Sequence, residues 1–271
     1  ELPLNLDMAP RSPWGGRLHR GYIQSWNFTV ERKLPLDTLV SAGYVATRTI
    51  HQMLDRNINT VGPGLGGDTR NLPLAKLYGR TNGMNMWDGS GYGSYNALQV
   101  ALPKSFSKGL FLNGAFTWSR YMNMSEDDGW AGLAMWSWEP MIYRNYAPSS
   151  EDRRRSFTLA WVYELPFGQG KPYALSGLAD KVLGGWKING GFSMYSGTPF
   201  TVSGSGSSLL CTGCSQTADQ IAAVRKIDQG RGPNMPYYDP MSFRDPLFIF
   251  SPANPVYRPG TMGRNALYGP G

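Results

Sequence analysis

The sequence predicts an all-β protein built from antiparallel, up-and-down β-hairpins. Three observations support this fold class: apolar and polar residues alternate along several segments, turns join these segments into pairs, and helical periodicity is nearly absent. The predicted hairpins are 22–49, 94–120 and 156–203. The predicted long loops are 50–93, 121–155 and 204–240. We therefore expect residues 1–271 to form a single β segment.

The first hairpin shows the two-residue period of a strand on both sides of a tight turn at residues 34–37. Ser, Asn, Thr and Glu occupy the opposite parity of the first strand. The apolar parity of the pair holds Tyr22, Trp26, Phe28, Val30, Val40, Ala42, Tyr44 and Ala46.

The second hairpin has the clearest alternation, with a predicted turn at 103–109, and the third has a longer connection at 165–185. A further short strand is expected over 200–203. The apolar parity of the second pair holds Leu98, Val100, Leu102, Leu110, Leu112, Phe116 and Trp118. That of the third pair holds Phe157, Leu159, Trp161, Tyr163, Trp186, Ile188, Phe192 and Met194.

Alternation alone does not separate a soluble β-sandwich from a membrane barrel, but three features favour the barrel. Large aromatics stand toward the ends of the apolar rows, small or weakly polar residues fill the opposite rows, and short turns alternate with long loops. We expect part of a transmembrane β-barrel with long outer loops, in which lipid faces Leu112, Phe116, Trp118, Phe157 and Trp161. A secreted sandwich with an aromatic core is the alternative.

Composition agrees with a barrel or an extracellular β protein, since only 17% of residues are charged. The net charge is +7, yet the one dense basic run, 153–155, directly follows Glu151 and Asp152, so no nucleic-acid site is expected. No run approaches the roughly 20 apolar residues of a membrane helix. No signal peptide starts at Glu1, so we expect a mature or truncated chain.

Cys211 and Cys214 form a C-x-x-C motif in a Gly- and Ser-rich loop. Two thiols do not complete a zinc site, and a thioredoxin-like site needs a following helix that the sequence does not supply. We expect a small loop disulfide in an oxidising compartment.

The remaining chemical motifs are weak. Gly62, Gly64 and Gly67 match G-x-G-x-x-G, but no amphipathic helix follows, so a loop is expected. No nucleophile elbow or H-E-x-x-H motif is present, and neither a catalytic residue nor a cofactor is predicted. The acidic run Glu126, Asp127 and Asp128 is a candidate calcium site, with a solvated loop as the alternative.

Aromatic residues crowd two of the long loops. Their rings have the shape to stack on sugars or on flat, apolar chelates, and loops often carry binding residues. The alternative is that they pack the loops against one another. These candidate ligand-binding residues are Trp87, Tyr92, Trp130, Trp136, Trp138, Tyr143 and Tyr146.

Several segments resemble the barrel part of TonB-dependent outer-membrane receptors, specifically the Oar-like receptors of acidobacteria with a carboxypeptidase-regulatory-like domain upstream. The resemblance runs from about residue 21 onward, and the motifs keep the order expected of that family. They are QSWNFTVER (24–32), YNALQV (95–100), DRRRSF (152–157), ELPFG (164–168), GGWKING (184–190), SGTPF (196–200), GRN (263–265) and GPG (269–271).

The resemblance implies a Gram-negative outer-membrane barrel that takes up a scarce solute, such as a siderophore or other iron chelate or an oligosaccharide, using energy from TonB. Its partners would be outer-membrane lipid, the solute, and TonB through parts outside this chain. Barrels of this kind have about 22 strands around a plugged lumen, so with no plug domain found we expect an internal receptor segment. Two alternatives stay open: a secreted, soluble glycan-binding module or hydrolase, and a self-assembling structural β protein joined through strand edges.

Overall fold

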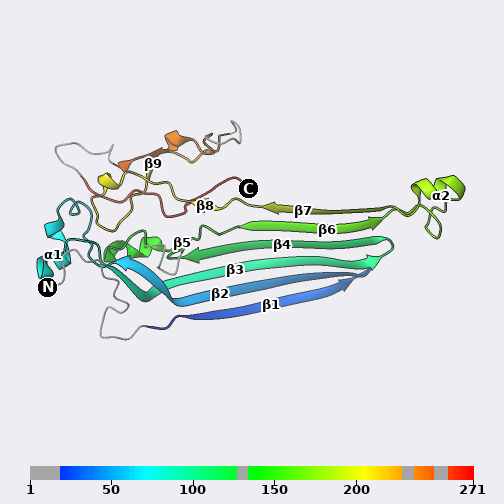
Figure 1. Cartoon of the computed structure of the whole chain (residues 1–271), viewed down its shortest axis with the longest axis horizontal. Helices are drawn as coiled ribbons and strands as arrows, with labels where there is room; N and C mark the ends of the chain where they lie inside the picture. Colours follow the sequence, from blue (N-terminus) through cyan, green and yellow to red (C-terminus); the bar gives the residue numbers. More distant parts are fainter. Residues whose placement is uncertain (1–18, 127–133, 228–234, 247–255) are drawn as a thin grey trace.

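The computed structural model describes residues 19–126, 134–227, 235–246 and 256–271, and it is dominated by one antiparallel sheet (Figure 1). The strand order is β1-β2-β3-β4-β6-β7, with β5 paired to β4. The predicted all-β, up-and-down fold is therefore confirmed. The bounds are β1 Tyr22–Leu34, β2 Thr38–Asn57, β3 Asn85–Ser107, β4 Leu110–Asn123, β5 Ala147–Pro148, β6 Arg155–Glu164 and β7 Lys187–Tyr195.

The smaller elements lie in the connections. Two short sheets pair β8 (Pro199–Phe200) with β11 (Leu267–Tyr268) and β9 (Asp219–Gln220) with β10 (Phe243–Arg244). Among the described residues, no helix has the length and apolarity needed to cross a membrane. The α-helices are α1 Pro73–Tyr78 and α2 Gly177–Leu183, and the 3-10 helices are Thr69–Asn71, Glu139–Asn145, Gly206–Ser208 and Pro240–Ser242.

The register of the sheet brings the predicted apolar parities onto one face. Directly opposed residues of antiparallel strands point to the same side of a sheet. One apolar row therefore crosses the whole sheet through Val30, Ala42, Val100, Phe116, Phe157 and Met194. The next row toward the long loops continues it with Phe28, Tyr44, Leu98 and Trp118.

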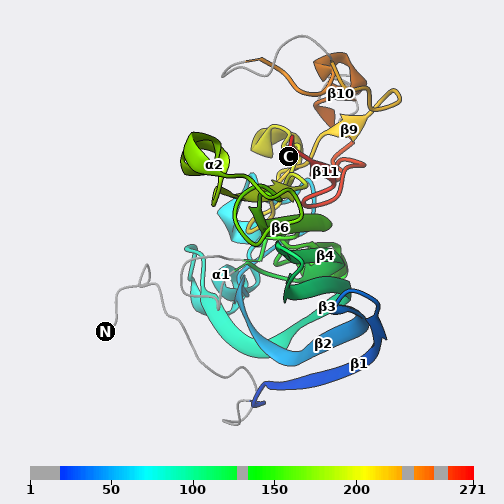
Figure 2. The same ribbon diagram turned by 90° about the vertical axis from the view of Figure 1, so that its right-hand side faces the viewer.

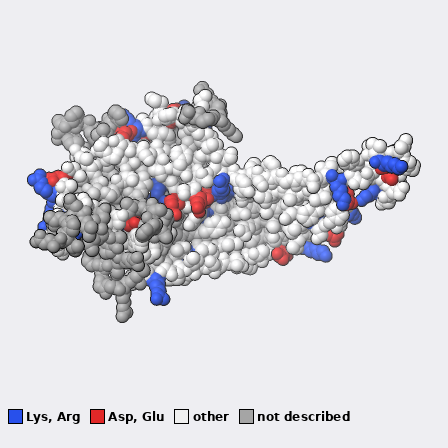
Figure 3. Space-filling view, viewed as in Figure 1, with Lys and Arg blue, Asp and Glu red and all other residues white. Residues whose placement is uncertain are grey.

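The opposite face is made mainly of small and polar side chains. The row next to the apolar one contains Thr29, Gly43, Gln99, Thr117, Ser156 and Tyr195. On the apolar face, by contrast, Phe28 is 70% exposed and Trp118 is 59% exposed. A water-soluble fold would cover such a surface, whereas a membrane barrel turns it toward lipid. In Figure 3 charged side chains gather at the loop end and toward the turn end, and the stretch of strands between them is almost free of charge.

The short turns explain why the hairpins form at the observed register. Lys108 and Gly109 form a two-residue turn with φ of 49° and 78°, the positive values that a type I′ hairpin requires. The predicted turn at 103–109 was too long, because β3 continues through Pro103 to Ser107. The β2–β3 register skips from the Thr38–Lys104 pair to the Ser41–Ala101 pair, around the position where proline has no N–H to donate.

The first predicted long loop was also too long. β2 runs to Asn57 and β3 begins at Asn85, so the connection placed at 50–93 spans 58–84. A register shift next to His51, whose φ is 54°, interrupts the alternation that marks a strand in sequence. A Cβ on Gly91 would lie 2.8 Å from the Gln52 carbonyl oxygen, so the glycines that read as a loop allow close backbone approach instead.

The remaining boundaries change at the ends of the sheet. The loop predicted at 121–155 includes the end of β4, β5 and the start of β6. The third hairpin ends at Tyr195, because β8 leaves the sheet and pairs with β11.

The sheet curves and twists, as Figure 2 shows from the end that carries α2. The long connections gather at the opposite end (Figure 1). We call the described parts of 58–84, 124–146 and 196–271 the cap. One buried cluster joins Leu54, Met124 and Ala134, and a second joins Trp136, Met141 and Leu209. The apolar core of the described chain therefore lies at the loop end, while the sheet leaves both faces open.

Candidate functional site

The polar face of the sheet carries a hollow of about 350 Å³ near the cap. This volume is within the range of small-molecule sites, about 300–1,000 Å³. Strands β3, β4, β6 and β7 supply one side, and the segment before β6 supplies the other. The lining residues are Tyr95, Gln99, Thr117, Ser119, Tyr121, Glu151, Asp152, Arg153, Ser156 and Tyr195.

The sheet register positions the strand residues of this hollow. Tyr95 lies opposite Tyr121, with their ring centroids 6.5 Å apart in an edge-on arrangement. Thr117 lies opposite both Gln99 and Ser156. Because all of these residues share the polar parity, their side chains stand together on the polar face of the sheet.

Asp152 fixes the segment that borders the hollow. Its side chain is almost completely buried, and its two carboxylate oxygens accept hydrogen bonds from the Tyr121 amide at 2.8 Å and the Tyr268 hydroxyl at 2.6 Å. Ser119 Oγ also donates to the Arg153 carbonyl oxygen at 3.0 Å. These bonds tie the 149–155 segment to β4, so the rim of the hollow is set by the sheet.

Two charged side chains remain exposed at this rim. Arg153 donates to the Ser196 carbonyl oxygen at 3.2 Å, and its guanidinium carbon lies 5.5 Å from the centre of the Tyr195 ring. Glu151 contributes a carboxylate on the same side. The hollow thus combines aromatic rings, hydroxyls, an amide and two opposite charges. Such a set is suited to binding a polar solute by hydrogen bonds and ring contacts.

The structure does not bring the predicted loop aromatics together into one site, and none of those it describes lines this hollow. Trp136 is fully buried and belongs to the cluster with Leu209. Trp138 packs against that cluster, and its ring fills the space where a Cβ on Gly62 would stand. These two tryptophans therefore pack the loops against one another, which is the alternative to ligand binding.

The other candidate aromatics are dispersed. Tyr92 and Tyr146 form a ring pair 4.8 Å apart, and the Tyr146 hydroxyl lies 2.9 Å from Ser94 Oγ. Trp87 belongs to β3, opposite a residue of β2, and Tyr143 is exposed on the cap. Trp130 lies outside the described residues.

Of the predicted acidic run, the structure describes Glu126, whereas Asp127 and Asp128 lie outside the described residues. Glu126 pairs with Arg264 at 2.6 Å and also accepts hydrogen bonds from Asn265, Ser149 and the Ser150 amide. Partial burial works to raise the pKa of Glu126, but these donors outweigh it and hold the pKa below its ordinary value. Within the described ranges, no three His, Cys, Asp or Glu side chains come together to hold a metal ion.

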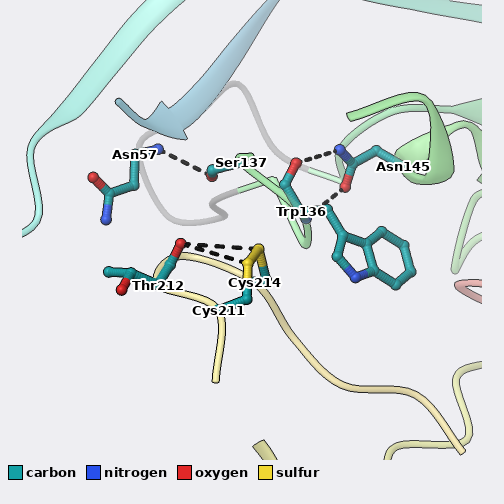
Figure 4. Close-up of a disulfide and its surroundings, with 7 residues drawn as sticks. All are labelled: Asn57, Trp136, Ser137, Asn145, Cys211, Thr212 and Cys214. Atoms are coloured by element: carbon teal, nitrogen blue, oxygen red, sulfur yellow. Dashed lines mark hydrogen bonds between the residues drawn. A yellow bond between two sulfur atoms is a disulfide. The ribbon is translucent and has the colours of Figure 1, made fainter. Parts of the chain in front are cut away.

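Cys211 and Cys214 are joined by a disulfide, in a loop that docks on the second buried cluster (Figure 4). The Ser137 amide donates to the Gly213 carbonyl oxygen at 3.0 Å, and the Ser215 amide donates to the Met135 carbonyl oxygen at 2.9 Å. Gly213 has a φ of 69°, and a Cβ there would lie 2.9 Å from a side-chain atom of Thr60. The disulfide therefore closes a loop whose backbone is paired to the cap interior.

The tyrosines that line the hollow were missed as site residues by the sequence reasoning, although a signal was present. Tyr95, Tyr121 and Tyr195 are bulky residues on a parity where Gly, Ala, Ser, Thr and Asn predominate. Arg264 and Asn265 were noticed only as part of a family motif, yet both bind Glu126. Their partner is distant in sequence, so no local pattern indicates the contact.

Comparison with known proteins adds one match. The family model described as outer membrane beta barrel domain matches residues 10–271. No curated protein and no solved structure matches the chain.

Proposed function

The chain belongs to the outer membrane beta barrel domain family, and from this premise we propose that it is part of a TonB-dependent receptor that takes up a scarce solute. The receptor binds the solute at the hollow beneath the cap and passes it inward with energy delivered by TonB. It works by binding and passage, not by covalent catalysis. Its solute is an oligosaccharide or an iron chelate.

The observation that carries this proposal is the position of the hollow. It lies on the polar face of the sheet, directly below the long outer loops, where a solute that enters from outside would first meet the barrel interior. Small residues occupy the neighbouring positions of that face, for example Gly43, Ala101 and Ala115. This wall therefore places no bulky side chain in the way of a solute at these positions.

The lining favours an oligosaccharide over an iron chelate. Tyr121 and Tyr195 offer ring faces, and Gln99 and Thr117 offer hydrogen-bonding groups that match sugar hydroxyls. The apolar outer face argues against the secreted, soluble alternative, because Phe28 and Trp118 would stand in water.

The test is solute binding by outer-membrane vesicles that carry the chain. The probes are labelled malto- and xylo-oligosaccharides and ferric hydroxamate chelates. We expect Tyr121→Ala and Tyr195→Ala each to weaken binding of one probe class about tenfold, the equivalent of one lost ring contact of about 1.4 kcal/mol. Tyr173→Ala is the matched control, because Tyr173 is 62% exposed in the connection that carries α2, at the opposite end of the strands.

Uptake by cells is the second readout, measured with TonB present and with TonB deleted. TonB-dependent accumulation that falls in the two hollow variants, but not in the control, supports the proposal. The proposal is contradicted if the wild type and all variants bind every probe equally. It is also contradicted if the cells accumulate the solute without TonB.

A further inference from the structure

A second hollow, of about 390 Å³, lies on the apolar face of the sheet and is distinct from the solute site. Strands β2, β3 and β4 form its floor, and the segment before β6 closes one side. Its side chains combine two aromatic rings and a leucine with one amide and two guanidinium groups, and Ala97 and Ser119 complete the lining. The first six are Tyr44, Leu98, Trp118, Asn96, Arg120 and Arg154.

This hollow lies at the edge of the apolar band. Leu98 and Trp118 belong to a row that is apolar or aromatic as far as β4 and ends at Arg155 on β6, and the next row toward the cap contains Asn96 and Arg120. From Leu110 to Trp118 the β4 strand covers about 26 Å at about 3.3 Å per residue. This length is comparable with the apolar band of an outer-membrane barrel, about 25 Å tall, which aromatic girdles flank at both interfaces. Because long loops mark the outer side, the hollow faces the headgroup level of the outer leaflet.

The arginines around this hollow have no carboxylate partner among the described residues. None of the ion pairs in the described chain includes Arg48, Arg120, Arg154 or Arg155. By register, Arg48 lies on the same face one row above Arg120, and Arg155 lies opposite Trp118. Four cations therefore lie near one interface of the band without a direct ion pair, and Asp152, the neighbouring carboxylate in sequence, is hydrogen-bonded to the Tyr121 amide and the Tyr268 hydroxyl instead.

The two arginines that line the hollow are held in place by neighbouring side chains. The Arg154 guanidinium lies 4.1 Å from the centre of the Tyr268 ring, and Tyr268 is fixed by its hydrogen bond to Asp152. Arg120 Nε lies 3.3 Å from the Met122 sulfur, a weak acceptor. Both guanidinium groups thus keep most of their donors for an external anion.

We propose that this hollow binds the phosphorylated headgroup of an outer-leaflet lipid. Arg120 and Arg154 hold the phosphate through charge-assisted hydrogen bonds, for which the planar guanidinium is well shaped. An acyl chain of the same lipid lies along Leu98 and Trp118, below the headgroup. The site anchors the loop end of the barrel to its own membrane and plays no part in passage of the solute.

The test is native mass spectrometry of the detergent-solubilised chain, titrated with diphosphoryl lipid A, the same lipid without phosphates, and phosphatidylglycerol. We expect the wild type to retain diphosphoryl lipid A most strongly. Arg120→Gln with Arg154→Gln should lower its retention about tenfold, as expected for the loss of hydrogen bonds to a charged group. Arg32→Gln with Arg70→Gln removes the same charge at other places and should leave retention unchanged.

Two further arms separate the sources of binding. Arg120→Lys with Arg154→Lys keeps the charges and should restore part of the retention, while circular dichroism verifies the β structure of every variant. Equal retention of the phosphate-free lipid would overturn the proposal, as would an equal loss in the control pair. If inorganic phosphate displaced lipid A at an equal concentration, the site would be assigned to free phosphate and the proposal of a lipid ligand would be overturned.

Discussion

The sheet and the cap of this protein are stabilised by different interactions. In the sheet, a repeated pattern places Val100, Phe116 and Phe157 in one row, and backbone pairing supplies most of the order. In the cap, individual side chains connect segments far apart in sequence: Arg264 reaches Glu126 and Asn123, and Arg144 donates to the Gly260 carbonyl oxygen. The sheet should therefore tolerate many substitutions that keep the face, whereas the cap depends on particular contacts.

The largest expected effect tests the sheet side of this comparison. Leu159→Arg places a charge in the middle of the apolar band, because Leu159 lies opposite Gly114, midway between Leu110 and Trp118 of β4, and we expect it to cost about 2–4 kcal/mol of folding free energy in a bilayer. Ala160→Arg is the control, because Ala160 is the adjacent residue on the polar face, opposite Asn113 and Gly191. The measurement is reversible urea unfolding in lipid vesicles. An equal cost for both variants would contradict the assignment of the two faces.

The next effect tests the cap. Arg264→Ala leaves Glu126 and the Asn123 side-chain oxygen without their buried cation, and we expect a loss of about 2–3 kcal/mol, at or below the lower end for breaking a buried pair, because the Glu126 side chain is 36% exposed. Arg70→Ala breaks an exposed ion pair with Asp68 and should cause no measurable loss. Hydrogen exchange at residues 256–265 measures the opening of the cap. Equal protection in the two variants would show that the cap does not depend on this contact.

The difference between sheet and cap also explains what could be predicted from sequence. The parity of Phe28, Leu98 and Trp118 is a local property, so the apolar face, the hairpins and their order follow from the alternation. The ends of β2 and β3 were missed because the register shift near His51 and the neighbouring glycines remove the alternation locally. The pattern carries information only where the strand is regular.

The candidate site was harder to predict for a physical reason. Trp136 and Trp138 were plausible ligand contacts because aromatic rings suit both binding and packing, and only burial separates these roles. Tyr121 and Tyr195 come together across β4, β6 and β7, so their proximity requires the sheet register. The contact between Arg264 and Glu126 joins residues with no local signature at all.

Removing the disulfide of the cap is expected to lower the free energy of unfolding by a smaller amount. Cys211→Ser with Cys214→Ser opens a loop of only a few residues, so the chain-entropy estimate gives a loss of about 2 kcal/mol. The loop also loses part of its pairing with residues 135–137 when it becomes mobile. Exchange protection of the Ser137 and Ser215 amides is the measurement, with the wild type under dithiothreitol as the comparison. The reduced wild type should match the double variant, and protection unchanged in both would mean that backbone pairing alone holds this loop.

The smallest expected effect is a dependence of the cap on pH, which we assign to two of its carboxylates, Glu126 and Asp219. Hydrogen bonds from Arg258, joined by one from the Thr261 amide, hold the pKa of Asp219 below its ordinary value, and the donors around Glu126 do the same there. Groups with a depressed pKa in the folded state stabilise it fully above their unfolded pKa, about 4, and lose this contribution as the pH falls through the folded pKa. Exchange protection at residues 256–265, corrected for the intrinsic rate, should therefore be constant from about pH 7 to 5 and fall below about pH 4. Asp219→Asn removes one of the two titrating groups and should flatten part of this fall, at the cost of lower protection near neutral pH. Protection that instead decreased with rising pH would mean that these carboxylates do not hold the cap in their charged form, and the contrast between a patterned sheet and an ion-paired cap would have to be abandoned.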